Sequence, residues 1–188
     1  MLSTFLSTIT EDSTADEVIS HMYGYSSTER SHALADWGQL LSDSHDSRKS
    51  WRPRCRKWWK VVPLVWGHCD LIPHERFEEL FDDFCVFDDD TRRRNLPKSL
   101  PQRFEVYRGQ DRYNAVGLSW TLSREVAQGF AIGHRGILNP NPVILKRTIA
   151  HSDVAFYLAE RGEAEVVLTN TYCGEETNEI LVTEKRRR

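Results

Sequence analysis

The N-terminal half of the chain carries apolar residues at helical spacing. Two apolar stripes predict helices over residues 31–41 and 75–90, and the second helix is rich in acidic residues. The stripes consist of Leu34, Trp37 and Leu41, and of Phe77, Leu80, Phe81 and Phe84. A shorter amphipathic helix is expected over residues 11–19. This half should therefore be helical, with its stripes turned into a core.

The C-terminal half changes to the apolar pattern of strands. Strands are expected over residues 104–109, 117–123, 142–149 and 162–168, with a last one from residue 180. A helix is expected over residues 124–131 and a loop over residues 151–161. We therefore expect an α+β protein, with a helical region at residues 1–100 packed on a β-rich core at residues 101–188 as one compact domain.

Seven basic residues, from Arg48 to Lys60, are interleaved with three tryptophans. One interpretation is a surface for nucleic acid, because basic side chains neutralise phosphates while aromatic rings stack on bases. The other is a helix whose tryptophans enter the core while its charges face water. We favour the helix, because Trp58 and Trp59 run directly into an apolar segment at residues 61–65. The segment is still the best candidate surface for a macromolecular target.

The net charge of −3 over 188 residues argues against a general attraction to nucleic acid or to a membrane. No apolar run approaches the roughly 20 residues of a membrane span, and the first residues do not resemble a secretory signal. We therefore expect a cytoplasmic protein with no membrane partner. The four cysteines form no Cys-x-x-Cys pair, and the spacing of His68, Cys69 and His74 fits no standard metal site. Reduced thiols and no metal are expected.

Two carboxylates stand at the head of the strand expected over residues 162–168. Because side chains alternate along a strand, Glu163 and Glu165 should point to one face. Neighbouring carboxylates repel, and they are seldom placed together without a catalytic task or a cationic partner. Taken alone, the pair is more simply explained as a strand end with solvated glutamates.

Two earlier segments supply partners for these acids. Arg108 and Gly109 end the strand expected over residues 104–109, where a guanidinium can bind phosphate and a glycine lets a ligand approach the backbone. Ser119 and Thr121 share one face of the next strand, where hydroxyls can orient a carboxylate. Simpler interpretations are a surface salt bridge for the arginine and plain strand hydroxyls.

The three segments, in this order, resemble the ADP-ribosyltransferase superfamily in its arginine–serine–glutamate class, which includes toxins and phage-encoded transferases. Val106-Tyr107-Arg108-Gly109 resembles the Tyr-Arg-Gly strand of the family. Ser119-Trp120-Thr121 resembles its Ser-Thr-Ser strand, and the helix that follows ends in Phe130-Ala131. Glu163-Ala164-Glu165 resembles its Glu-x-Glu strand. Trp120 departs from the pattern, which has a small residue there. The resemblance covers about the C-terminal half of the chain.

The resemblance implies a split β-sandwich of the ADP-ribosyltransferase type as the α+β core, and NAD as the substrate. It implies a mono-ADP-ribosyltransferase that breaks the bond between nicotinamide and ribose and transfers ADP-ribose to an acceptor. The implied catalytic residues are Arg108, Ser119, Glu163 and Glu165. The implied NAD contacts are Tyr107, Arg108, Gly109, Ser119, Trp120, Thr121 and Phe130. Phe156 and Tyr157, in the loop before the acids, resemble an aromatic feature that helps to choose the acceptor.

The acceptor, the activity and the cellular setting each have more than one interpretation. A Glu-x-Glu pair is typical of members that modify protein arginine, so we expect a protein acceptor, while nucleic acid bound through Arg48 to Lys60 is the alternative. A catalytically inactive module that binds a partner is a second alternative. The resemblance also suggests a toxin or phage protein that acts in the cytoplasm, either of the producing cell or of a host. A glycoside hydrolase is a poorer interpretation, because adjacent carboxylates do not flank a sugar from opposite faces.

Overall fold

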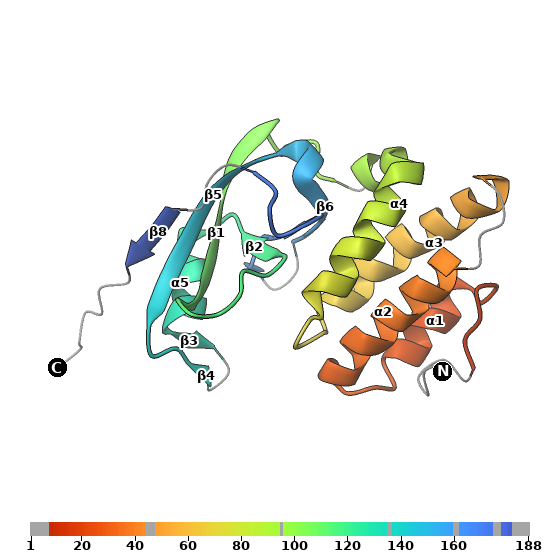
Figure 1. The fold of residues 1–188 in the computed structure, drawn as a ribbon, viewed down its shortest axis with the longest axis horizontal. Coiled ribbons are helices and arrows are strands. Elements are labelled where there is room, and N and C mark those ends of the chain that lie inside the picture. The colour runs from red at the N-terminus through yellow and green to blue at the C-terminus, as the bar shows by residue number, and fades with distance from the viewer. Residues whose placement is uncertain are drawn as a thin grey trace. The chain divides into compact units, whose positions relative to one another are not determined.

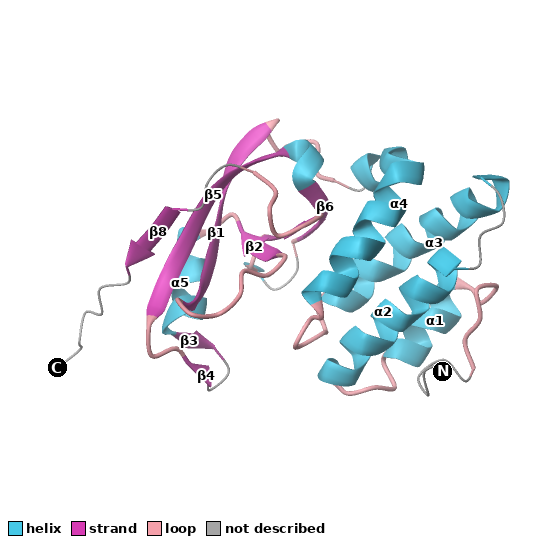
Figure 2. Cartoon of the chain, in the orientation of Figure 1, coloured by secondary structure: helices cyan, strands magenta, loops and turns pink. Residues whose placement is uncertain are grey.

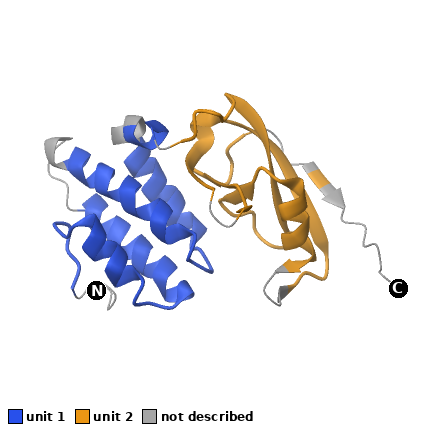
Figure 3. Ribbon diagram, turned by 180° about the vertical axis from the view of Figure 1, so that it is seen from behind, with its two compact units in different colours: residues 1–95 blue, residues 96–188 orange. Residues whose placement is uncertain are grey.

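The computed structural model describes residues 8–43, 48–94, 96–134, 137–159, 162–174 and 178–181. The chain divides into two compact units, Met1–Asn95 and Leu96–Arg188 (Figure 3). The described part of the first unit is helical, and every described strand belongs to the second (Figure 2). The expectation of an α+β protein is therefore confirmed.

The helical unit contains four helices in its described part (Figure 1). They are α1 at Ala15–Met22, α2 at Ser27–Asp43, α3 at Arg48–Trp66 and α4 at His74–Arg94. The helices expected over residues 31–41 and 75–90 lie inside α2 and α4. The helix expected from residue 11 begins later, because Thr14 caps it. The Thr14 hydroxyl accepts from the Glu17 backbone N–H at 3.3 Å, and the Glu17 carboxylate accepts from the Thr14 N–H at 2.7 Å.

The core of the helical unit is aromatic. Trp58 stacks on Phe84 with ring centroids 4.9 Å apart, and Trp51 lies parallel to the same ring at 5.1 Å. Trp59 stacks on Phe81 at 5.8 Å. All five rings are at most 1% exposed. The tryptophans of the basic segment therefore belong to the core, as the favoured interpretation expected, and they are not available to stack on bases.

Three basic side chains of the same segment lie on the outer side of α3. Arg52, Arg56 and Lys60 are exposed and follow one another at a spacing of four residues. Lys60 forms an ion pair with Asp16 of α1 at 3.4 Å. The segment thus combines a buried aromatic side with an exposed cationic side.

The second unit is built on one antiparallel sheet with the strand order β6-β7-β2-β1-β5-β8. The strands are β1 at Arg103–Asp111, β2 at Ser119–Thr121, β5 at Pro142–Ala150, β6 at Val154–Leu158, β7 at Glu165–Leu168 and β8 at Asn178–Leu181. Strands β3 at Gly133–His134 and β4 at Ile137–Leu138 form a separate small ribbon, and α5 covers Arg124–Ile132. The longest pairing joins β1 to β5, from Arg103 opposite Ala150 to Asp111 opposite Pro142.

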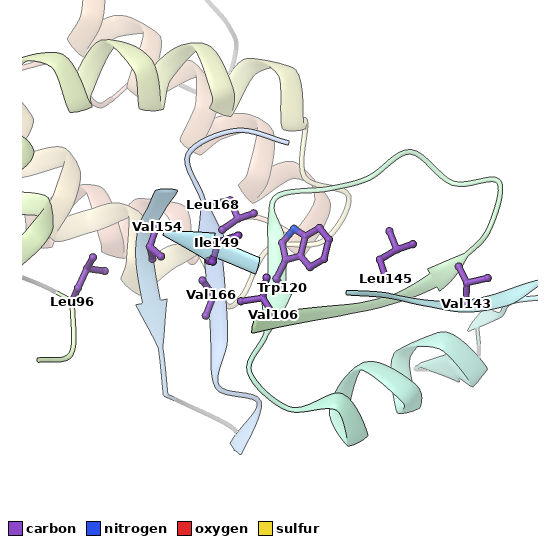
Figure 4. Close-up of a cluster of buried hydrophobic side chains, with 9 residues drawn as sticks. All are labelled: Leu96, Val106, Trp120, Val143, Leu145, Ile149, Val154, Val166 and Leu168. Carbon is purple, nitrogen blue, oxygen red and sulfur yellow. The ribbon is translucent and has the colours of Figure 1, made fainter. Parts of the chain in front are cut away.

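The two faces of the sheet pack differently. One face enters an apolar core shown in Figure 4. Its buried members are Leu96, Val106, Trp120, Val143, Leu145, Ile149, Val154, Val166 and Leu168. The other face is covered by α5, whose Ala127 and Ala131 pack with Ile144 and Tyr107. The Ser123 hydroxyl caps this helix by accepting from the Val126 N–H at 3.2 Å.

Helix α5 lies directly on β1 at Gly109. A Cβ atom on Gly109 would stand 1.7 Å from the Ala127 carbonyl oxygen and 2.4 Å from the Ala131 nitrogen. Both atoms are backbone, so they cannot swing away as the end of a side chain could. The glycine that we expected to admit a ligand is required here by the helix.

Three sequence expectations about the strands are wrong. The first strand continues to Asp111, so Arg108 and Gly109 lie inside it and not at its end. The loop expected over residues 151–161 contains a 3-10 turn at His151–Asp153 and then strand β6. The strand expected from residue 162 begins at Glu165, because Gly162 and Ala164 have φ angles of 69° and 45°, outside the range of strands. The sequence also indicates a turn at residues 134–136 and a basic end at residues 185–188, of which residues 135, 136 and 185–188 lie outside the described residues.

Candidate active site

The three strands that carry the sequence motifs, β1, β2 and β7, lie side by side in the sheet. Tyr107 pairs with Thr121, and Thr121 pairs with Glu165. Paired residues of antiparallel strands point to the same face, so these three side chains form one row across the strands. This is the face that α5 covers, and Ser119 shares it because it lies two residues from Thr121.

Arg108 lies on the opposite face of β1 from this row. Strand alternation groups it with Val106 and Gln110, yet its Nη1 donates to the Ser119 carbonyl at 2.6 Å and its Nε to Gln110 Oε1 at 2.8 Å. Burial lowers the pKa of Arg108 to about 10, and the negative charge of Glu165 opposes this shift. The guanidinium therefore stays charged at neutral pH and interacts electrostatically with the carboxylate of the third motif.

The first carboxylate of the acidic pair lies in the turn before β7. The Thr121 hydroxyl donates to the Glu163 backbone carbonyl, and the Leu122 N–H donates to the Ala164 carbonyl at 3.2 Å. These two bonds attach the turn to the end of β2. The positive φ of Ala164 interrupts the strand, so Glu163 and Glu165 do not alternate as neighbours in one strand. The expectation that they share a strand face is wrong.

Tyr107 is held in place by a carboxylate on its own strand. Its hydroxyl donates to Glu105 Oε2 at 2.8 Å, and Glu105 also forms an ion pair with Lys146 of β5. The hydrogen bond with Glu105, together with burial, raises the pKa of Tyr107. The phenol is therefore neutral at physiological pH, and its ring forms part of the packing under α5.

Trp120 does not lie in the row of candidate residues. It stands between Ser119 and Thr121 in β2, so its side chain points to the opposite face, where it is 2% exposed. Its Nε1 donates to the Gly117 carbonyl at 3.1 Å, and the guanidinium carbon of Arg147 lies 4.8 Å from its ring centroid. Trp120 is a core residue (Figure 4), and the prediction that it contacts NAD is wrong for this structure.

The two aromatic residues expected to choose the acceptor belong to strand β6. Phe156 pairs with Val167 and is 2% exposed, so it is not accessible to an acceptor. Tyr157 pairs with Val166 and is half-buried against the apolar core. The prediction of a loop at these positions is wrong, because the apolar run Val154–Leu158 is used as a strand.

Phe130, the remaining predicted NAD contact, is half-buried on α5. Its backbone carbonyl accepts from Asn139 Nδ2 at 3.0 Å, and the same amide donates to the Ala131 carbonyl at 3.0 Å. Asn139 therefore caps the C-terminal end of α5, where helical carbonyls lack partners within the helix. Phe130 lies on α5, the element that directly follows β2 in sequence, and β2 carries Ser119 and Thr121.

Sequence analysis missed the role of Gln110 in this site. Its side chain is 6% exposed, its Oε1 accepts from Arg108, and its Nε2 donates to the Asn114 carbonyl at 2.8 Å. The available signal was its position two residues after Arg108, which places both side chains on one face of a strand.

Three further observations concern cofactors and surroundings. Among the residues that the structure describes, no group of three His, Cys, Asp or Glu side chains is placed to hold a metal ion. The four cysteines are free thiols, and burial raises the pKa of Cys69 to about 12. Within the described ranges, no helix is both long and apolar enough to cross a bilayer.

Comparisons with known protein families, with curated proteins and with solved structures give no match to this chain. The chemistry of the site therefore rests on its own residues. These are the desolvated Arg108 of β1, the Glu165 carboxylate of β7 that attracts it, and the hydroxyls of β2, the strand between them.

Proposed function

We propose that the protein is a mono-ADP-ribosyltransferase that uses NAD as its substrate. The observation that carries the proposal is the electrostatic attraction between Arg108 on β1 and Glu165 on β7, from motifs far apart in sequence, with Ser119 and Thr121 on β2 between these two strands. The proposal extends to the fold, a split β-sandwich of the ADP-ribosyltransferase type.

Arg108 binds the pyrophosphate of NAD. A guanidinium has five N–H donors, of which the described chain engages two through Ser119 and Gln110. The other donors are offered to phosphate oxygens, and partial burial strengthens such charged hydrogen bonds because little water competes for them. Tyr107 lies next to Arg108 in β1 and contacts the nicotinamide side of the dinucleotide, with Phe130 of α5. Gly109 follows Arg108 in β1 and is covered by α5.

Glu165 stabilises the transition state. The bond between nicotinamide and ribose C1′ breaks, the nicotinamide leaves with the bonding electron pair, and positive charge develops on the ribose as in an oxocarbenium ion. A fixed carboxylate next to the ribose stabilises that charge, and it also accepts a hydrogen bond from a ribose hydroxyl. Ser119, on the same sheet face as Glu165, helps to orient the carboxylate.

Glu163 acts on the acceptor. The acceptor nucleophile forms a new bond to C1′, and Glu163 orients it or takes up the proton that it loses. The position of Glu163 in the turn before β7, half-buried and outside the strand, suits contact with an incoming group better than a second place in the sheet would. A carboxylate there can also engage a guanidinium, so the proposed acceptor is protein arginine.

The test is to measure nicotinamide release and ADP-ribose transfer for three purified variants. Glu165→Gln should lower both rates by about a hundredfold or more, since it removes the charge that stabilises the transition state. Glu163→Gln should lower transfer much more than hydrolysis of NAD. Glu179→Gln is the matched control, because this carboxylate lies on β8, away from the motif strands, in an exposed ion pair with Arg112. Wild-type rates in the Glu165→Gln variant would refute the assignment.

The acceptor class is tested by incubating a cell lysate with the protein and radiolabelled NAD. Label that is sensitive to protease and resistant to nuclease supports protein modification, and the opposite result supports nucleic acid. The burial of Trp51, Trp58 and Trp59 removes base stacking from the nucleic-acid alternative. An inactive binding module would show no stabilisation by NAD, whereas a ligand at one hundred times its Kd should stabilise by about 2.7 kcal/mol. We place the activity in the cytoplasm of the producing cell or of a host cell.

A further inference from the structure

We propose that Gln110 is a positioning residue that fixes the guanidinium of Arg108 for binding the pyrophosphate of NAD. This inference rests on the proposed function. It assigns the orientation of Arg108 to a neutral amide on the same strand and not to the carboxylates of the site.

The contacts of Gln110 form a continuous chain of hydrogen bonds. Its Oε1 accepts from Arg108 Nε at 2.8 Å, and its Nε2 donates to the Asn114 carbonyl at 2.8 Å. Asn114 itself is bound to the strand end, since its N–H donates to the Asp111 carbonyl at 3.1 Å. Because Gln110 is 6% exposed, loss of either bond leaves a buried polar atom unsatisfied. The amide is therefore held in one orientation.

The fixed amide determines which donors of Arg108 face a ligand. The Nε donor is engaged by Gln110 and one Nη1 donor by the Ser119 carbonyl, on two different sides of the planar guanidinium. Rotation about the last bonds of the side chain would break at least one of these contacts. The donors at the Nη2 end keep one direction, so a pyrophosphate meets an arginine that needs no reorganisation.

The direct test measures hydrogen exchange at Arg108 Nε by nitrogen-15 NMR of the full chain, with the signal assigned by its loss in Arg108→Lys. In the wild type the Nε–H should exchange slowly, because it is hydrogen-bonded and half-buried. Gln110→Met has nearly the same length but no comparable acceptor, and it should accelerate exchange at least tenfold. Gln110→Glu keeps an acceptor oxygen and should retain the protection. Unchanged exchange in Gln110→Met would overturn the positioning role.

Asp111→Ala is the matched control for general loosening of the neighbouring loop. The Asp111 carboxylate accepts from the Tyr113 N–H at 3.0 Å and from the Asn141 N–H at 2.8 Å, and neither bond involves Arg108. This variant should leave the Arg108 Nε–H protected from exchange. If Asp111→Ala accelerates this exchange as much as Gln110→Met does, Gln110 acts only by stabilising the loop, and the proposal fails.

The consequence for NAD is tested by a double-mutant cycle on KM. Gln110→Met should raise the KM for NAD about tenfold with a much smaller effect on kcat, and it should have almost no further effect in an Arg108→Lys background. Additive effects would contradict action through Arg108. If the wild-type protein neither binds nor cleaves NAD, the proposed function fails, while the exchange experiment still decides whether Gln110 positions Arg108.

Discussion

Gly109 offers the sharpest test of how α5 and β1 are packed. The perturbation is Gly109→Ala, which adds one methyl group at a point where the nearest atoms would be backbone, 1.7 Å and 2.4 Å away. Ordinary contact distances are about 3.5 Å, so α5 would have to move away by more than 1 Å. The move would separate Ala127 and Ala131 from Ile144 and Tyr107.

The expected cost is about 3 kcal/mol. Overpacking a well-packed core costs roughly 1–3 kcal/mol, and the upper end applies because neither close atom belongs to a flexible side chain. Since 1.4 kcal/mol corresponds to a factor of ten, the population of open states in the second unit should rise about a hundredfold. The alanine itself adopts the strand backbone without strain, so the loss is attributable to the collision.

Hydrogen–deuterium exchange of β1 and β5 peptides in the full chain is the appropriate assay. Tryptophan fluorescence would mix the two units, because Trp120 is the only one of the six tryptophans that lies in residues 96–188. The exchange rate of the most protected β1 amides should rise about a hundredfold in Gly109→Ala, as expected when exchange follows the free energy of opening.

Gly129→Ala is the matched control on the same helix. Among the described residues, no atom outside its own helix backbone lies within 4 Å of the position that its Cβ would occupy, and replacing a helical glycine by alanine stabilises by about 0.5–1 kcal/mol. Exchange should therefore slow by about two- to fivefold in this variant. Equal exchange in Gly109→Ala and the wild type would refute the described contact between α5 and β1.

Two other predictions concern the cap of α5 in the second unit and the thiol of Cys69 in the helical unit. Ser123→Ala removes the cap of α5 and should lower stability by about 1 kcal/mol, which is measured as roughly fivefold faster hydrogen exchange in α5 peptides. Ser123→Asp should be near neutral, because aspartate also caps helices. Equal loss of stability in both variants would argue against the capping role. Burial raises the pKa of the Cys69 thiol to about 12, which disfavours the reactive thiolate. At pH 8, iodoacetamide should therefore alkylate Cys69 at least a hundredfold more slowly in the folded protein than in the denatured protein, as measured by peptide mass spectrometry. Similar rates in the two states would contradict the burial of the thiol.

Local pattern was sufficient for the helices and for most strands. The apolar stripe from Phe77 to Phe84 predicts α4 because its spacing is that of one helix turn, whatever the stripe packs against. The strand expected over residues 142–149 is found as β5 at Pro142–Ala150, because its apolar run also suits a strand without reference to distant segments. The pattern failed at Val154–Leu158. This apolar run is short, and it forms a strand because it pairs with β7, which the local sequence does not show.

Candidate residues were identifiable by type but not by position. Arg108, Ser119 and Glu165 could be selected because their side chains suit a dinucleotide. Their proximity depends on the pairing of β1, β2 and β7, which are separated by long stretches of chain. Sequence alone also could not show that Ala164 takes a positive φ and moves Glu163 out of the strand.

The amino-acid sequence by itself determined the periodic elements, the aromatic core of the helical unit and the residue types of the candidate site. Only the tertiary structure decided that Trp120 and Phe156 are buried, that α5 requires Gly109, and that Gln110 holds Arg108. The physical reason is the separation of the interacting residues along the chain. Side-chain periodicity follows from the geometry of a few successive residues, whereas burial and hydrogen-bond partners depend on segments that only folding brings together.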